Sequence, residues 1–336
     1  MHIYLLLQGG EIPFLWGKAA VKYVGFIAYF AIFGTLGFRF LVLGLWSKRP
    51  AAQYAGEAET LASVDEAAER IAARVGFAGS LLLLLHVAGV TARKAYLSHI
   101  GLLDALLKAE PEDIAQTVIA PFLALAFGLA LRRARGCWIT AALAGVALAL
   151  RHVVTWRWAA QVGPLHGVAA ALWLGTLFVL VVAGLPAIRR APAARGSRGP
   201  LVARLVARFS TLALVAAGFV GLSGIVVSWL HLKYVAALWT TSYGYTLIAK
   251  LGVVAVVVAL GAWNWRRMTP KLSAEEAAHE LRRSSAAELV FAGVVLLLTA
   301  VLVSLPGPKL PKAVAEAATP KVKDTRSLSG MESTRR

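Results

Sequence analysis

The feature that most constrains this chain is a series of apolar runs, each about 20 residues long and almost free of charge. A helix of about 20 residues rises about 30 Å, which is the thickness of the hydrocarbon core of a bilayer. Only 15% of the residues are charged and 59% are hydrophobic, whereas a soluble domain carries about 25% charged residues. The runs are continuous rather than alternating, which disfavours a transmembrane β-barrel. The sequence therefore predicts an all-α, polytopic transmembrane helical bundle and excludes a soluble enzyme, a secreted disulfide scaffold and a disordered protein.

We expect about eight spans, with boundaries that follow the apolar runs. They cover residues 24–46, 75–92, 114–131, 137–154, 165–185, 209–230, 244–265 and 286–305. The chain then divides into an N-terminal interfacial segment (1–23), a four-span region (24–160), a second four-span domain (161–306) and a disordered basic tail (307–336). Residues 50–74 are expected to form a separate amphipathic helix on the membrane surface.

Basic residues predict the orientation of the spans. The loops after the first, third, fifth and seventh spans hold 18 Lys and Arg residues, and the other three loops hold six. The positive-inside rule places the richer set in the cytoplasm and both termini outside. The tail, with seven basic residues, opposes this orientation, but the loops outnumber it. Because the positive charge lies in short loops, we expect a lipid bilayer as its partner and no nucleic acid.

Ionisable residues inside a membrane are costly and usually functional. The predicted spans contain Arg39, His86, Arg151, His152, His166, Lys250 and Glu288. The orientation places His86, His152, His166 and the span-end residue His231 in the outer half of the membrane. Imidazole is a common ligand for copper, zinc and iron, so these four histidines are candidate metal or haem ligands. The alternative is that each one is an interhelical hydrogen-bonding residue.

A second set of polar residues suggests a path toward the inner face. Lys250 lies in the outer half, and either reaches outward to the interface or lines a polar cavity. Asn264 and Glu288 lie near the inner ends of their spans, and Trp173 lies in the middle of its span. Glu288 is the only acid in the predicted spans. It either accepts hydrogen bonds from Asn264 or a neighbouring arginine, or lies near a helix N-terminus, where the dipole favours an acid. Lys250 and Glu288 differ in depth, so we do not expect them to pair.

Five segments of the second half occur in a characteristic order. They are LHGVAAALWLGTLFVL with His166, Trp173 and Gly175; RFSTLALVAAGFVGLSG with Arg208, Ser210, Ala213 and Gly221; YGYTLIAKLG with Tyr243, Gly244 and Lys250; NWRRMTPKL with Asn264 and Pro270; and LRRSSAAELVFAGVVLLLTAVLVSLPGP with Arg282, Glu288 and Pro306. Together they resemble the copper resistance D (CopD) family of membrane proteins, over roughly residues 166–306. The first four spans are similar to the family only in number and hydrophobicity.

The resemblance implies a multi-pass protein of the bacterial inner membrane that takes part in copper homeostasis and is not an enzyme. It implies that copper is the transported ion, moving from the periplasm into the cytoplasm, and that a periplasmic copper-binding protein of the CopC type is a partner. In this interpretation the outer histidines capture copper, and Trp173, Lys250, Asn264 and Glu288 line its path. Two alternatives stay open: a haem b-binding electron-transfer protein, with paired histidines as axial ligands, and a membrane assembly factor that transports nothing.

Overall fold

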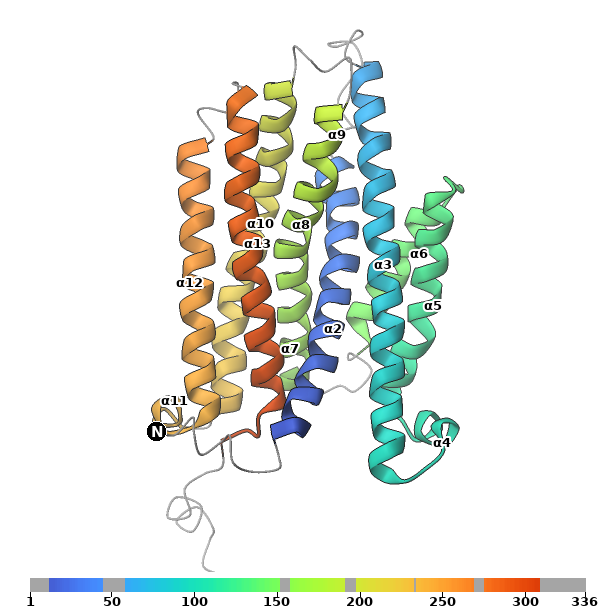
Figure 1. Cartoon of the computed structure of the whole chain (residues 1–336), viewed down its shortest axis with the longest axis vertical. Coiled ribbons are helices and arrows are strands. Elements are labelled where there is room, and N and C mark those ends of the chain that lie inside the picture. The colour runs from blue at the N-terminus through green and yellow to red at the C-terminus, as the bar shows by residue number, and fades with distance from the viewer. Residues whose placement is uncertain are drawn as a thin grey trace, which may run out of the picture.

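The computed structural model describes residues 12–44, 58–151, 158–190, 198–232, 234–268 and 275–308. Within these ranges every regular element is a helix. Seven of the helices are long and apolar enough to cross a membrane. They run side by side along the long axis of the molecule (Figure 1). The all-α polytopic bundle predicted from the sequence is therefore confirmed.

The first half of the bundle contains the helices α2 (Ile12–Gly37), α3 (Ala58–Ser98), α4 (Leu102–Leu107), α5 (Pro111–Leu131) and α6 (Cys137–Leu150). A π-helical segment, η1 (Phe38–Leu43), continues α2. The predicted span 137–154 corresponds to α6, which has 14 residues and is the one predicted span shorter than a membrane-crossing helix within the described ranges. The last residues of that prediction, including His152, lie outside the described part of the chain.

The second half begins with one continuous helical run made of α7 (Trp158–Ala170), η4 (Ala171–Gly175), α8 (Thr176–Val179), η5 (Leu180–Gly184) and α9 (Leu185–Arg190). It continues with α10 (Arg198–Leu232), α11 (Ala237–Thr240), α12 (Ser242–Met268) and α13 (Glu275–Ser304). The segments η4 and η5 are π-helical and interrupt the regular hydrogen-bond ladder twice.

The separate surface helix expected over residues 50–74 is wrong where the structure describes it. From Ala58 onward these residues belong to α3, which runs without interruption to Ser98. The stretch contains no proline and is rich in alanine and glutamate, so nothing in it ends a helix. Residues 50–57 lie outside the described ranges. The polar start of α3 therefore extends the second span beyond its apolar part.

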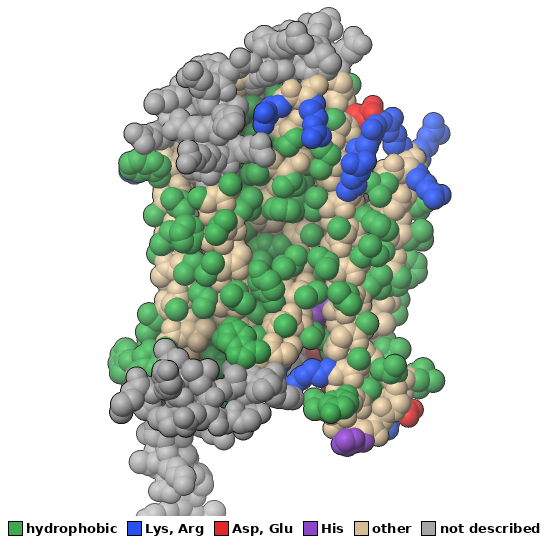
Figure 2. Space-filling view, viewed as in Figure 1, with side chains coloured by type: hydrophobic (Ala, Val, Ile, Leu, Met, Phe, Trp, Pro, Cys, Tyr) green, Lys and Arg blue, Asp and Glu red, His purple; other side chains and the backbone are tan. Residues whose placement is uncertain are grey.

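The helix ends that flank the four basic loops all lie at one end of the bundle, the upper end in Figure 1. They are the end of η1 and the start of α3, the α5–α6 turn, the end of α9 and the start of α10, and the end of α12 and the start of α13. Lys and Arg side chains gather at this end (Figure 2). The fold thus shows the alternation of basic and less basic loops between the two ends of the bundle. Which end faces the cytoplasm stays a prediction.

The helix α2 forms the centre of the bundle and contacts α3, η4, α8 and α13. Its closest approach is to η4, where Gly34 faces Gly175. A Cβ atom added to either glycine would overlap backbone atoms of the other helix. Small residues allow such close crossings between membrane helices. This contact joins the first half of the chain to the second.

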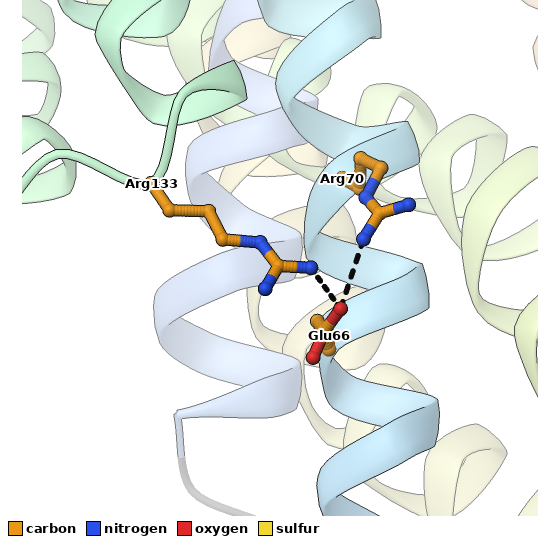
Figure 3. Close-up of polar contacts among 3 residues, drawn as sticks. All are labelled: Glu66, Arg70 and Arg133. Carbon is orange, nitrogen blue, oxygen red and sulfur yellow. Dashed lines mark hydrogen bonds and ion pairs between the residues drawn. The ribbon is translucent and has the colours of Figure 1, made fainter.

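Ion pairs hold the basic end of the first half together. Glu66 on α3 accepts hydrogen bonds from Arg70 at 2.9 Å, one turn away, and from Arg133 in the α5–α6 turn (Figure 3). Arg39 on η1 pairs with Glu69 on α3, with Nε 3.0 Å from Oε1. Arg39, one of the ionisable residues in the predicted spans, therefore has a carboxylate partner.

Candidate functional site

A histidine and a serine meet where α7 packs against α10. The Nδ1 atom of His166 lies 3.0 Å from the Oγ atom of Ser223. That hydroxyl donates its own hydrogen to the carbonyl oxygen of Phe219 at 2.6 Å. Ser223 must then accept a hydrogen bond from Nδ1–H of a neutral His166. This tautomer leaves Nε2 of His166 with a free lone pair, as in histidines that bind metals.

Two neighbours complete the surroundings of His166. Gly224 lets the ring approach α10 closely, because a Cβ atom there would lie 3.2 Å from Cε1 of His166. Lys250, half-buried on α12, interacts electrostatically with the imidazole. No ion pair of Lys250 is found among the described residues. We call His166, Ser223 and Lys250, which come from three helices, the outer polar group.

The middle of this region is apolar. Leu174, Val257, Ala292 and Val295 form a buried cluster, contributed by η4, α12 and α13. The half-buried Trp173 packs against it. We call these five residues the apolar plug. Trp173, predicted to line a path, thus packs against apolar side chains rather than lying at a polar site.

A buried polar pair lies beyond the plug. Asn264 on α12 is 9% exposed and Glu288 on α13 is 7% exposed. The amide Nδ2 of Asn264 donates a hydrogen bond to Oε1 of Glu288, which is one of the alternatives expected from the sequence. Because α13 begins at Glu275, Glu288 lies 13 residues, or about 20 Å, into the helix. The alternative interpretation of Glu288 as a helix-start residue is therefore wrong. We call Asn264 and Glu288 the inner pair.

The three parts are stacked along α12. Lys250 and Asn264 are 14 residues apart on this continuous helix, which corresponds to about 21 Å of rise. Val257 of the plug lies between them. The order along the bundle axis is therefore polar, apolar, polar, with the buried amide and carboxylate nearest the basic end of the bundle.

The other predicted histidine ligands have separate partners. Nδ1 of His86 on α3 lies 2.8 Å from the carbonyl oxygen of Val21 on α2. Nδ1 of His231 lies 2.8 Å from the carbonyl oxygen of Val227, and the ring stacks on Tyr243. A carbonyl only accepts, so both rings also keep Nε2 free when neutral.

These histidines do not form one cluster in the described part of the chain. No group of three or more His, Cys, Asp or Glu side chains that could hold a metal ion occurs there. His152 lies outside the described ranges. A metal site built from His86, His152, His166 and His231 therefore stays a prediction.

Sequence reasoning missed Ser223. A single serine in an apolar span usually bonds to its own helix backbone, as Ser223 also does. The available signal was its position next to Gly224, in a run of small residues that indicates a close helix contact.

The comparisons with known proteins cover the part of the chain that holds most of these residues. The model of the family described as Copper resistance protein D matches residues 203–302, which include Ser223, Lys250, Asn264 and Glu288. A segment of 165 residues, 49% of the chain, is 28% identical to the "Copper transport protein CutJ" of Bacillus subtilis (strain 168). It spans 28% of the length of that relative. No solved structure matches the chain.

The family match and the site overlap closely. The matched residues form most of α10, all of α12 and most of α13, while His166 and Trp173 precede them. Residues 203–302 thus match the model of the copper resistance D family, which confirms the resemblance seen in the sequence over this part of residues 166–306.

Proposed function

We propose that this protein moves copper across a bacterial inner membrane, from the periplasm into the cytoplasm, along the contact region of α7, η4, α10, α12 and α13. The observation that carries the proposal is the order of the site: two polar groups separated by an apolar plug, in the segment related to copper proteins. The positive-inside rule supports a periplasmic position for the outer polar group.

The outer polar group is suited to hold a copper ion briefly. Nε2 of His166 offers the lone pair that copper requires, and the hydrogen bond to Ser223 fixes the ring. Lys250, when charged, weakens the attraction between His166 and a cation. Weak binding is useful in a transport path, because an ion must leave each site as readily as it enters.

The inner pair offers a carboxylate on the other side of the plug. Glu288 attracts a cation that has passed the apolar residues, and Asn264 holds the carboxylate in place. The plug has no polar side chain to replace the hydration shell of an ion. Passage therefore requires η4, α12 or α13 to move, so that the plug residues separate.

The remaining expectations belong to the same proposal. The inward direction is what the resemblance to the copper resistance D family implies. The resemblance to the copper resistance D family supports a periplasmic donor of the CopC type and a non-enzymatic role, with copper as the cargo.

The test is copper accumulation in cells that express single variants at equal membrane abundance, measured by elemental analysis. His166→Ala should lower uptake several-fold, alone or together with His86→Ala. His279→Ala, on α13 at the predicted cytoplasmic end, is the matched control and should leave uptake unchanged. Equal uptake by the His166 and His279 variants would remove His166 from the mechanism.

A further inference from the structure

Two buried polar atoms in the first half of the bundle have no hydrogen-bond partner among the described residues. They are Oη of Tyr29 on α2 and Nε of Arg151 at the end of α6. The guanidinium carbon of Arg151 lies 5.3 Å from the centroid of the Tyr29 ring, so both atoms belong to one place in the fold. Neither residue lies in the segment that matches the copper resistance D family. The proposed copper path therefore does not account for them.

The packing of α6 on α2 brings these two residues together. Gly145 lets α6 approach α2 closely, because a Cβ atom there would overlap Cδ1 of Leu36. Tyr29 lies seven residues before Leu36, and Arg151 lies six residues after Gly145. Since α2 ends and α6 begins at the basic end of the bundle, the two steps lead to the same level. The 14 residues of α6 rise about 21 Å, so Arg151 lies within the thickness of a hydrocarbon core of about 30 Å.

The charge at this level is positive. Arg151 and the half-buried Lys22 on α2 have no ion pair among the described residues. The two cations act electrostatically on each other, and the carboxylate that acts on Lys22 is that of the exposed Asp113 at the start of α5. Two cations and one carboxylate leave an excess of one positive charge. An arginine stays protonated in proteins, and a charge inside a membrane needs a partner.

The unpartnered atoms are hydrogen-bond donors. Arg151 donates from Nη1 to the carbonyl oxygen of Leu148 at 2.8 Å and keeps its Nε–H group free. The neighbouring guanidinium offers no acceptor to the O–H group of Tyr29, because an arginine only donates. A buried donor without an acceptor costs free energy. The component that would satisfy both donors and the excess charge is an anion.

We propose that Tyr29 and Arg151 bind a small monovalent anion of the halide class, such as chloride. The anion accepts hydrogen bonds from the O–H group of Tyr29 and the Nε–H group of Arg151, and Lys22 attracts it at longer range. Its single charge matches the excess of one positive charge. A divalent oxyanion such as sulfate would leave a surplus negative charge and several oxygens without donors. The site is independent of the proposed copper path.

The experiment is thermal unfolding of the purified full chain in detergent, titrated with sodium chloride while sodium gluconate keeps the ionic strength constant. Chloride should raise the melting temperature, and the rise should follow a saturable binding curve, as for any ligand that binds only the folded state. Bromide should act like chloride, whereas sulfate at equal ionic strength should not. A rise that does not saturate, or one that sulfate reproduces, would overturn the proposal.

A matched pair of tyrosine variants tests the position of the site. Tyr29→Phe removes only the hydroxyl group and should weaken chloride binding about tenfold. Tyr96→Phe changes an exposed tyrosine in the same way and should have no effect. Without chloride, Tyr29→Phe should melt at or above the native temperature, because it removes an unpaired donor. Equal chloride affinity of the two variants would overturn the proposal.

A second pair tests the charge. Arg151→Gln should abolish the saturable effect of chloride, whereas Arg135→Gln, which changes an exposed arginine in the α5–α6 turn, should retain it. If Arg151→Gln fails to fold, Lys22→Met replaces it and should weaken chloride binding several-fold. A native chloride response in the Arg151 variant, or in the Lys22 variant where it stands in, would contradict the proposed site.

Discussion

Glu288 gives the sharpest test of the proposed path, because two substitutions separate its charge from its hydrogen bond. Glu288→Gln keeps the size of the side chain and an oxygen that accepts from Asn264, but removes the charge. Glu288→Leu removes both. If the carboxylate only anchors Asn264, Glu288→Gln should behave like the native protein. If its charge attracts copper, Glu288→Gln should lower uptake while the protein stays folded.

The contacts of the inner pair set the size of each effect. Glu288→Leu deprives a buried Asn264 of this acceptor, which costs about 1–3 kcal/mol in soluble proteins and about 0.6 kcal/mol on average between membrane helices. We therefore expect a destabilisation of about 1 kcal/mol for Glu288→Leu and less for Glu288→Gln. A carboxylate about 5 Å from a monovalent cation contributes about 3 kcal/mol at an effective dielectric constant of about 20. Loss of about half of this attraction, about 1.4 kcal/mol, would lower the affinity for the cation tenfold.

The assay combines two measurements on each variant. Thermal unfolding in detergent reports stability, and copper accumulation at limiting and saturating copper reports transport. Glu288→Gln should unfold at nearly the native temperature and lose uptake about tenfold at limiting copper. Asn264→Leu combined with Glu288→Leu should be less destabilised than the two single changes added together, because the coupled pair is removed as a unit. Native uptake by Glu288→Gln at both copper concentrations would refute the charge argument.

Two further predictions concern the fold. Reporter fusions at Arg195 and Thr240 should report cytoplasm and periplasm, respectively, and the opposite result would reverse the orientation of the path. Gly175→Ala should destabilise the protein by about 1–3 kcal/mol, because its Cβ would meet the backbone of α2; Gly218→Ala, which has open space around it, should be neutral or stabilising. Equal melting temperatures of these two glycine variants would contradict the close α2–η4 contact.

The sequence predicted the spans well because hydropathy reports burial in a bilayer directly. It failed where helices continue past the apolar part. In α3 the charges that begin before Val75 end the apolar run but not the helix, so Ala58–Ser98 forms one element. The same error displaced the start of the last helix, whose first residue is Glu275 rather than Ala286. A charged stretch of alanine and glutamate is a good helix former whether or not lipid surrounds it.

Hydrogen-bond partners on different helices were predictable only where their shared depth in the membrane was enough to identify them. Asn264 and Glu288 lie near the same ends of consecutive antiparallel spans, so their hydrogen bond could be expected. The histidines share a depth but lie on different pairs of helices: His86 faces α2, and His166 faces α10. The depth of a residue in the membrane does not determine the rotation of its helix about the helix axis. It does not determine the order of the helices around the bundle either. Grouping these residues from sequence alone therefore went further than hydropathy allows.

The proposed path requires part of the bundle to move, and the packing and position of α12 favour this helix. The helices α2 and α7–α9 bury more than half of their apolar stretches within the protein, whereas α10 and α12 each bury 11%. The extensive contacts of α12 are with α13 and the short α11. Yet α12 carries Lys250, Val257 and Asn264, one residue from each layer of the proposed path. A shift of α12 against a fixed core would therefore open the plug and move both polar groups at once, at a lower packing cost than any shift of α2.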